Sequence, residues 1–419
     1  MPPSPQVVRT SGKTQAYSLK STTCSRKFFS TDQVYTSVAR KGARTVSETI
    51  SGPKLVDNRK LLMKRDSSNT TSTNKPFTSE AGEMISLLRS NDLVQSVTFT
   101  KELYVALNFL PQMLNDLHHF CVLGDSILRV DTTFELVEGL WLTDTTYSNE
   151  ALVDLNGKSP KFPGPSFWHF RKSRECYQRF AGELVIQKPE LQDIKKIGHD
   201  LDKALSDGLS DIFRGAKSLW CTQHMQERDL HKLKCLGANQ RTQGRIMADI
   251  YGSQDEILLQ NGLADADDES DFEAKLESLK PLWSDLVPGF HHWFESNRSK
   301  QFKDCLILSA RQILGIEGRF YTNGLELKHK LQKKRLSEEN VPKEVAAVTL
   351  QLNTWAEDFY LEEVRSIQGL GKYRLAPGYD RFQVDPVRWN RLGPERQAQH
   401  LESLSRHLTT RMQSQSQLV

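Results

Sequence analysis

The pattern of apolar and polar positions divides the chain into parts of different character. Residues 1–80 hold 25 serines and threonines and show no sustained apolar period, which predicts a disordered arm. From about residue 82, apolar side chains recur at helix and strand spacing, so we expect folded structure to begin there. Residues 81–119 are interpreted as a helical lead-in.

Residues 120–237 have the pattern of an α/β domain. The stretch 120–147 is rich in Val, Ile, Leu, Thr and Phe and carries turn signals at Gly124 and Gly139, which indicates two or three consecutive strands. We then expect helices over 172–187, 201–213 and 225–237, and strands over 194–200 and 216–224. Consecutive strands followed by alternating helices and strands predict a mixed sheet with flanking helices, an α/β fold.

Helical periodicity continues over 238–315 without an evident strand, which predicts an all-helical insertion. A further helix is expected within 316–340. Residues 341–419 are interpreted as C-terminal helices and a tail punctuated by proline and aromatic residues.

Charge is distributed unevenly along the chain. The whole sequence has a net charge of +4, yet residues 1–80 contain 14 lysines and arginines against 5 acidic residues. The rest of the chain is therefore mildly acidic. A basic arm on an acidic body suits a polyanionic partner, and nucleic acid is the obvious candidate. An import signal or a solvated tail remains an alternative.

Several classes of protein are excluded or disfavoured by composition. No run approaches eighteen consecutive apolar residues, so a membrane-spanning helix is not expected. The first residues lack the apolar segment of a secretory signal. Six cysteines in 419 residues are too few for a disulfide scaffold and suit a reducing compartment. We expect an intracellular protein.

Three acidic residues stand out by local context. Asp131 lies inside the strand pattern RVDTTF, where carboxylates are depleted. Asp200 closes the strand IKKIGHD, at the carboxyl edge where α/β sheets hold their sites. Glu326 lies in the first turn of the helix that opens YTNGLELKHK. Each also fits a structural role: Asp131 on the outer face of a hairpin, Asp200 as a helix N-cap, and Glu326 in a capping box with Asn323.

The short sequence motifs around these acids resemble those of a known protein family. VDTTF, TDTTYSNEAL, FPGPSFWHFRK, CYQRF, IGHDLDKAL, AKSLWCTQHM and FYTNGLELKHK are similar, in this order, to successive blocks of Mutator-like element (MULE) transposases, in a divergent animal subgroup. The tail GKYRLAPGYDRFQVDPVRWNRLGPERQAQHL resembles the end of proteins in that subgroup. The resemblance covers roughly 85–415. It implies an RNase H-like sheet with flanking helices, interrupted by the helical insertion.

The resemblance also implies an activity and its residues. Asp131, Asp200 and Glu326 match the DDE catalytic acids, which would hold two Mg²⁺ (or Mn²⁺) ions for DNA cleavage and strand transfer. Asp131 would bridge both ions. Cys221 and His224 match a Cys-x-x-His element and are interpreted as site-shaping residues. The implied partners are transposon-end and target DNA, with a homo-oligomer possible, and the implied compartment is the nucleus.

Two further sets of residues were weighed for binding. Cys221, His224, His231 and Cys235 are zinc-ligand types, but no second Cys-x-x-Cys pair accompanies them, so zinc is not expected. The runs RKSR (171–174) and KHKLQKKR (328–335) are candidates for contacts with DNA phosphates, and solvated helix faces are the alternative. The DNA-contact candidates of the second run are Lys328, Lys330, Lys333, Lys334 and Arg335. The tryptophans 168, 220 and 293 are interpreted as core residues.

Three interpretations of function stay open. The first is an active transposase. The second is a domesticated or decaying transposase that binds DNA or protein without catalysis; it is favoured by His199, Leu201 and Leu327, which replace the family's residues beside two of the acids, and by the lack of a recognisable DNA-binding module before residue 81. The third, a plain RNase H-type nuclease, is disfavoured by the long insertion and the family-like tail.

Overall fold

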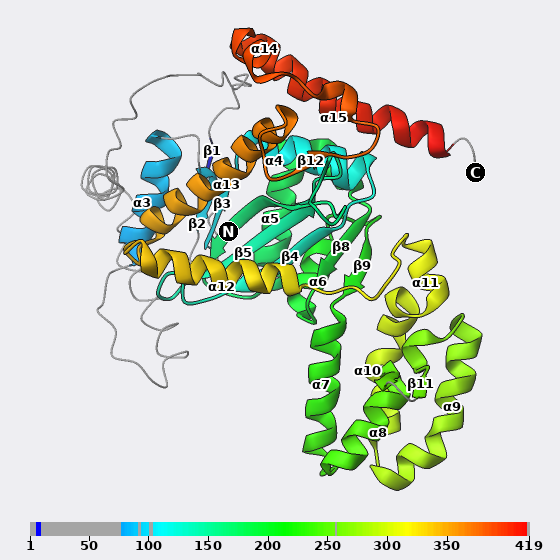
Figure 1. Cartoon of the computed structure of the whole chain (residues 1–419). Helices are drawn as coiled ribbons and strands as arrows, with labels where there is room; N and C mark the ends of the chain where they lie inside the picture. Colours follow the sequence, from blue (N-terminus) through cyan, green and yellow to red (C-terminus); the bar gives the residue numbers. More distant parts are fainter. Residues whose placement is uncertain (1–5, 10–76, 91–93, 100–103, 256–257, 417–419) are drawn as a thin grey trace.

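A computed structural model describes residues 6–9, 77–90, 94–99, 104–255 and 258–416 (Figure 1). Most of the predicted disordered arm, residues 1–80, lies outside the described residues. Within the described residues, no helix combines the length and apolar character needed to cross a membrane.

The centre of the protein is a sheet of eight strands in the order β1-β2-β3-β7-β5-β4-β8-β9. Strands β4 and β8 run parallel, as do β8 and β9, and all other neighbours in this sheet are antiparallel. The fold is therefore mixed α/β, as the sequence predicts. The strands are β1 (Gln6–Arg9), β2 (Val94–Phe99), β3 (Tyr104–Asn108), β4 (Leu128–Thr133), β5 (Trp141–Ser148), β7 (Lys161–His169), β8 (Lys196–His199) and β9 (Lys217–Trp220).

Helices cover both faces of this sheet. On one face α5 (Arg174–Gln187) and α6 (Lys203–Ser210) pack in an apolar core that includes Val130, Phe167 and Phe180. Alternate strand residues point the other way, toward α12 (Asn323–Glu338) and α13 (Val345–Ile367), which lie across the opposite face (Figure 1).

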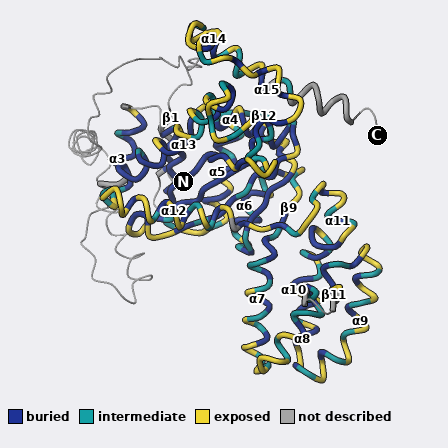
Figure 2. The backbone as a smooth tube through the Cα atoms, viewed as in Figure 1, coloured by how far each residue is buried: buried dark blue, intermediate teal, exposed yellow. Residues whose placement is uncertain are grey.

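A helical block follows β9 and has its own core. Its large aromatic residues include Phe272, Trp283, Phe290 and Phe294, all fully buried. Figure 2 shows a buried interior in both the sheet region and this block. The helices are α7 (Thr222–Cys235), α8 (Gln240–Tyr251), α9 (Glu269–Leu286), α10 (Phe290–Gln301) and α11 (Leu308–Ile313), with a π-helical turn at Phe302–Leu306.

The remaining elements frame these two regions. They are α3 (Phe77–Ser90), α4 (Pro111–Asp116), a π-helical segment at Leu117–Leu123, the small sheet of β6 (Leu152–Val153) with β12 (Arg374–Leu375), and three short 3₁₀ turns at Pro189–Asp193, Leu263–Asp265 and Asp380–Phe382. The chain closes with α14 (Pro386–Arg391) and α15 (Pro394–Ser416).

Four predictions from the pattern are corrected. The lead-in 81–119 is only partly helical, because β2 and β3 extend the sheet; Tyr104–Asn108 is buried throughout, and a continuous apolar run looks alike in a helix and a strand. The same ambiguity between helix and strand applies to the π-helix at Leu117–Leu123, most of which was expected to be strand.

The insertion 238–315 contains a hairpin of β10 (Ser253–Asp255) and β11 (Leu258–Gln260), whose strands are too short to show alternation. At the start of the arm, β1 pairs with β2.

The strand β7 is built from the proline- and glycine-rich run that precedes α5. It pairs with β3 on one side and β5 on the other, and its register with β5 shifts between Asp144 and Thr146. A Cβ at Gly164 would lie 2.4 Å from the Thr145 hydroxyl oxygen, so only glycine allows the two strands to approach this closely. The irregular stretch thus forms an integral part of the sheet.

Candidate functional site

A row of polar side chains crosses the face of the sheet that lies under α12. Asn108 of β3 is directly opposite Ser166 of β7, which is opposite Asp144 of β5, which is opposite Asp131 of β4. Directly opposite residues place their side chains on the same face. Asn108 donates a 2.5 Å hydrogen bond to the Ser166 hydroxyl, which holds the first pair together.

The candidate acid Asp200 directly follows the next strand of the sheet, β8, which ends at His199. Strands β4 and β8 pair in parallel, with Leu128 opposite Ile197 and Arg129 opposite Gly198. The Asp200 carboxylate accepts a hydrogen bond from the Asp202 backbone N–H. Asp200 therefore lies just beyond the carboxyl end of the strand that neighbours β4.

The segment leading into α12 passes over the same two strands. A Cβ at Gly198 would lie 2.1 Å from the Phe320 ring, so the chain before α12 rests directly on the glycine backbone. The Arg129 guanidinium lies 5.8 Å from the centre of that ring. This contact brings the start of α12, with Glu326 in its first turn, to the end of β4 and β8.

Helix α12 contacts the polar row through His329. One ring nitrogen, Nδ1, lies 3.5 Å from Asp131 Oδ2, and the other, Nε2, lies 3.5 Å from Asp144 Oδ2. Burial alone lowers the pKa of His329, but the two carboxylates outweigh it and raise the pKa above its ordinary value. Glu326 and His329 are three residues apart and share one side of the helix.

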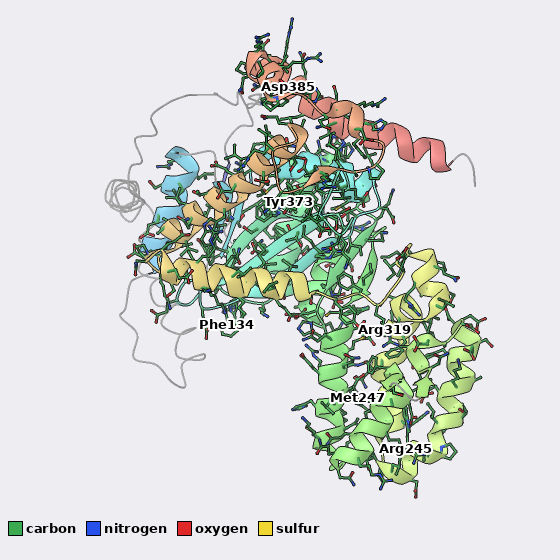
Figure 3. All side chains as sticks on the ribbon, viewed as in Figure 1. Phe134, Arg245, Met247, Arg319, Tyr373 and Asp385 are labelled. Carbon is green, nitrogen blue, oxygen red and sulfur yellow. The ribbon has the colours of Figure 1, made fainter. Side chains whose placement is uncertain are left out.

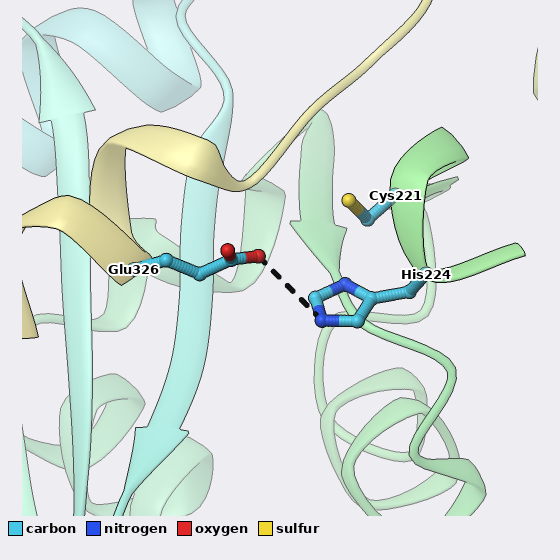
Figure 4. Close-up of side chains that lie close together, drawn as sticks. All are labelled: Cys221, His224 and Glu326. Atoms are coloured by element: carbon cyan, nitrogen blue, oxygen red, sulfur yellow. Dashed lines mark ion pairs between the residues drawn. The ribbon is translucent and has the colours of Figure 1, made fainter. Parts of the chain in front are cut away.

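Glu326 meets the helix that follows β9. Its Oε1 lies 3.5 Å from His224 Nε2, and ligand atoms of Cys221, His224 and Glu326 all lie within 4.8 Å of one another (Figure 4). The neighbouring Cys221 sulfur raises the pKa of His224 to about 9; burial opposes this rise, and the charges of Asp200 and Glu326 add to it. Cys221, His224 and Glu326 therefore lie together where α12 begins.

The structural roles considered for the three acids do not describe them. Asp131 is 8 % exposed and faces α12, so it is not on the outer face of a hairpin. The N-cap of α6 is Asp202, whose carboxylate accepts two backbone N–H groups, while Asp200 accepts from the Asp202 N–H. Helix α12 has no side-chain cap bond, so Glu326 forms no capping box.

The DNA-contact candidates on α12 separate into inward and outward residues. Lys328 points at the sheet, where its ammonium lies 2.9 Å from Asp144 Oδ2, so its charge is paired within the protein. Lys330 and Lys334 are exposed. Lys333 and Arg335 are engaged with neighbours on the surface: an ion pair of 3.6 Å joins Lys333 to Glu135, and Arg335 stacks 4.5 Å from the Trp355 ring centre.

An aromatic pair was missed by sequence reasoning. Phe134, labelled in Figure 3, directly follows β4 and is half exposed. Its ring centre lies 5.2 Å from that of Trp141, which is partly buried. Two cations flank the pair: Lys333 lies 4.9 Å from the Phe134 ring and Lys172 of the RKSR run lies 4.7 Å from the Trp141 ring. Aromatic rings beside lysines are of the kind that stack on the bases of a nucleic acid.

The four zinc-ligand types considered in the sequence do not form one site. Cys221 and His224 lie at the start of α7, whereas His231 and Cys235 contact each other at its end, with the sulfur 3.6 Å from His231 Nδ1. Seven residues of helix separate the two histidines by about 10 Å. The tryptophan prediction is confirmed, since Trp168 is fully buried and Trp220 and Trp293 pack against the core of the helical block.

Among the described residues, the group whose ligand atoms all lie within 4.8 Å of one another is Cys221, His224 and Glu326. Asp131 and Asp200 are not part of that group; Asp131 instead lies 3.5 Å from the His329 imidazole. Oxygen ligands are what Mg²⁺ and Mn²⁺ prefer. Cys221 and His224 add softer ligands on the Glu326 side only.

Comparison with known protein families finds no family model that matches the chain. Comparison with curated proteins finds no match either.

Two residues of the site carried a signal that sequence reasoning did not use. Asp144 stands in a strand pattern, TDTTY, of the same kind as Asp131 in VDTTF, and His329 follows Glu326 by three residues. A carboxylate inside a strand and a histidine on the same helix side as an acid both point inward.

Proposed function

We propose that the chain is a DNA transposase of the Mutator-like type, with an RNase H-like core and DDE chemistry. The observation that carries the proposal is that β4, which holds Asp131, pairs in parallel with β8, which Asp200 directly follows, while α12 places Glu326 3.5 Å from His224 and His329 3.5 Å from Asp131. The sheet order β7-β5-β4-β8-β9, with β7, β5 and β4 forming an antiparallel meander, supports the RNase H-like assignment.

The roles of the three acids follow from the family resemblance. Asp131 would bridge a pair of Mg²⁺ or Mn²⁺ ions, and Asp200 and Glu326 would each hold one. Such ions activate the attacking oxygen and stabilise the leaving oxygen in displacement at phosphorus. His329 would fix Asp131 in place, and His224 would orient Glu326. The half-exposed Phe134 with the partly buried Trp141, together with Lys330 and Lys334, would hold the DNA strand.

This proposal names partners and a compartment. The partners would be transposon-end DNA and target DNA, and strand transfer at two ends suits a homo-oligomer. The compartment would be the nucleus, where that DNA resides.

The test is cleavage of supercoiled DNA by the purified full chain in Mg²⁺ or Mn²⁺. Asp131→Asn, Asp200→Asn and Glu326→Gln should each lower nicking by at least about 100-fold, because each removes a charge and a metal ligand. Asp285→Asn and Glu295→Gln are matched controls, since both side chains are exposed on the helical block, and both should nick as the parent does.

A second function is favoured by a specific observation. His224 and His329 each lie 3.5 Å from one of the proposed acids, and partial neutralisation by the protein's own imidazoles suits a site that has ceased to hold metal. The chain would then be a domesticated transposase that binds DNA or protein without catalysis. Three results together would favour this second function. The chain would still bind DNA, it would not nick DNA in Mg²⁺ or Mn²⁺, and calorimetry would detect no Mn²⁺ binding that depends on Asp131.

A further inference from the structure

A cavity of about 310 Å³ lies between the sheet, α12 and α13. Its walls include Asn108 and Asp144 from the sheet, Gln332 from α12 and Trp355 from α13. It lies beside Asp131, because Asp144 contacts the same imidazole of His329 that contacts Asp131. Its volume is at the lower end of the range for small-molecule sites, about 300–1,000 Å³.

Four buried polar atoms around this cavity have no hydrogen-bond partner within the described part of the chain. They are Asn108 Oδ1, Gln332 Oε1, Asn353 Nδ2 and Trp355 Nε1. Each of the four residues is less than a tenth exposed. A buried polar atom without a partner costs about 1–3 kcal/mol, so four of them in the wall of one small cavity indicate that something else satisfies them.

The chemistry of two of these atoms is fixed. Gln332 Nε2 donates to Asp144 Oδ2 over 3.1 Å, so the free Gln332 oxygen can only accept. The Trp355 indole N–H can only donate. The amides of Asn108 and Asn353 can offer either group. An occupant must therefore carry both a donor and an acceptor along its edge.

The rest of the lining narrows the class of occupant. Leu352 and Phe359 of α13 supply apolar surface, and Leu331 of α12, which lines the cavity, is 48 % exposed. Lys161 and Arg335 also line the cavity and bring positive charge. Apolar walls, donors and acceptors along an edge, and cations suit a flat heterocycle attached to a phosphate.

We propose that this cavity binds a nucleobase that has left its base pair in a DNA strand held at the proposed acids. The inference rests on the proposed function, because the base comes from the DNA on which that site would act. Asn353 and Trp355 would read the edge of the base, Gln332 would accept from it, and Lys161 would hold the adjoining phosphate. Unpairing a base costs a few kcal/mol, which these contacts would offset.

The test measures binding in a buffer without divalent cations, so that no cleavage occurs. The probes are a duplex with one unpaired 2-aminopurine, the same duplex fully paired, and free dAMP. The parent chain should prefer the unpaired-base duplex and change its 2-aminopurine fluorescence on binding. Asn353→Leu and Trp355→Phe should each weaken this preference by about fivefold, as expected for one lost hydrogen bond, while binding to the paired duplex stays unchanged.

A structural role for these residues would give a different result. Asn353→Leu removes an unpaired buried amide at nearly constant volume, so thermal unfolding without DNA should occur at the same temperature or higher. A fall in stability without a loss of preference would overturn the proposal. Asn297→Leu, the same change at an exposed position of α10, is the control and should bind both duplexes as the parent does.

The other outcomes separate this inference from the proposed function. Equal binding of both duplexes by parent and variants would mean that the cavity holds only water, whatever the nicking assay shows. Binding of dAMP without a preference for the unpaired-base duplex would assign the cavity to a free nucleotide and overturn the proposal. If the chain prefers the unpaired-base duplex, loses this preference in Trp355→Phe and does not nick DNA, the base-binding cavity is supported and the proposed catalytic function is refuted.

Discussion

The two faces of the sheet differ in chemistry although they belong to the same strands. On the α5 side, Val130 and Phe167 pack in a closed apolar core. On the α12 side, the neighbouring positions hold Asp131 and Ser166. Alternation of side chains along a strand makes this separation possible, so one face buries apolar residues at the positions where the other buries polar ones.

A second contrast exists within the polar face. Asp144 and Asp131 are directly opposite each other and share His329, yet Asp144 also receives Lys328 and Gln332. Burial alone would raise the pKa of Asp144, but Lys328 and His329 outweigh it and hold the pKa well below its ordinary range. The two aspartates are alike in sequence, but Asp144 is paired with Lys328, Gln332 and His329, whereas the ion pair of Asp131 is with His329.

The largest effect on stability is expected from Asp144→Ala. It leaves the Lys328 ammonium and the Gln332 amide without their buried partner, and breaking a buried ion pair in this way costs about 3–5 kcal/mol. Chemical denaturation of the variant and the parent measures the difference. The double variant Asp144→Leu with Lys328→Met removes both charges and should recover much of the loss. A single variant as stable as the parent would show that the pair contributes nothing.

The next effect tests the closed face through pH. Buried His169 stacks on Phe167 and hydrogen-bonds Thr143, and burial lowers the pKa of His169 to about 3 from an ordinary 6.5. Between these values the unfolded chain binds a proton that the folded chain does not, so stability falls as pH falls. At 1.36 kcal/mol per pH unit, this amounts to about 2 kcal/mol between pH 6.5 and pH 5.

The variant His169→Gln keeps a side chain that can donate and accept but does not titrate. Its free energy of unfolding should depend less on pH over that window than the parent's. Some slope should remain, because burial also lowers the pKa of His199. Equal slopes in the two chains would mean that His169 takes up its proton within the folded state.

A smaller effect on stability is expected from Asp131→Asn, the counterpart of Asp144→Ala. Among the described residues, the ion pair of Asp131 is with the His329 imidazole, whereas Asp144 has Lys328, Gln332 and the same imidazole, so the neutralisation of Asp131 should destabilise the protein less than Asp144→Ala does. Titration calorimetry with Mn²⁺ should nevertheless show the loss of cation binding. A destabilisation as large as that of Asp144→Ala would erase the distinction between the two aspartates.

The sequence predicted the α/β pattern because its strands and helices carry strong local signals. The blocks around Asp131, Asp200 and Glu326 marked a strand, the end of the neighbouring strand and the first turn of a helix, which is where the structure has these acids. It could not predict that Lys328 turns inward, because the run KHKLQKKR has no single polar face and only the position of Asp144 in the folded sheet decides which lysine is buried. Nor could it locate the α12–α13 cavity, since its walls come from segments more than 150 residues apart.

The smallest effect is expected at the outward lysines of α12. Lys330 and Lys334 are exposed, so the double variant Lys330→Gln with Lys334→Gln should leave stability unchanged within about 0.5 kcal/mol. If both contact DNA phosphates, the slope of log affinity against log salt should fall by about 0.9 for each. Fluorescence anisotropy on a duplex of fixed length measures this slope, and its change shows whether the two lysines contact DNA phosphates or are only solvated. Lys280→Gln with Lys300→Gln, exposed on the helical block, is the matched control. An unchanged slope in the α12 variant would mean that DNA does not run along this helix, and would leave Phe134 and Trp141 as the surface to test.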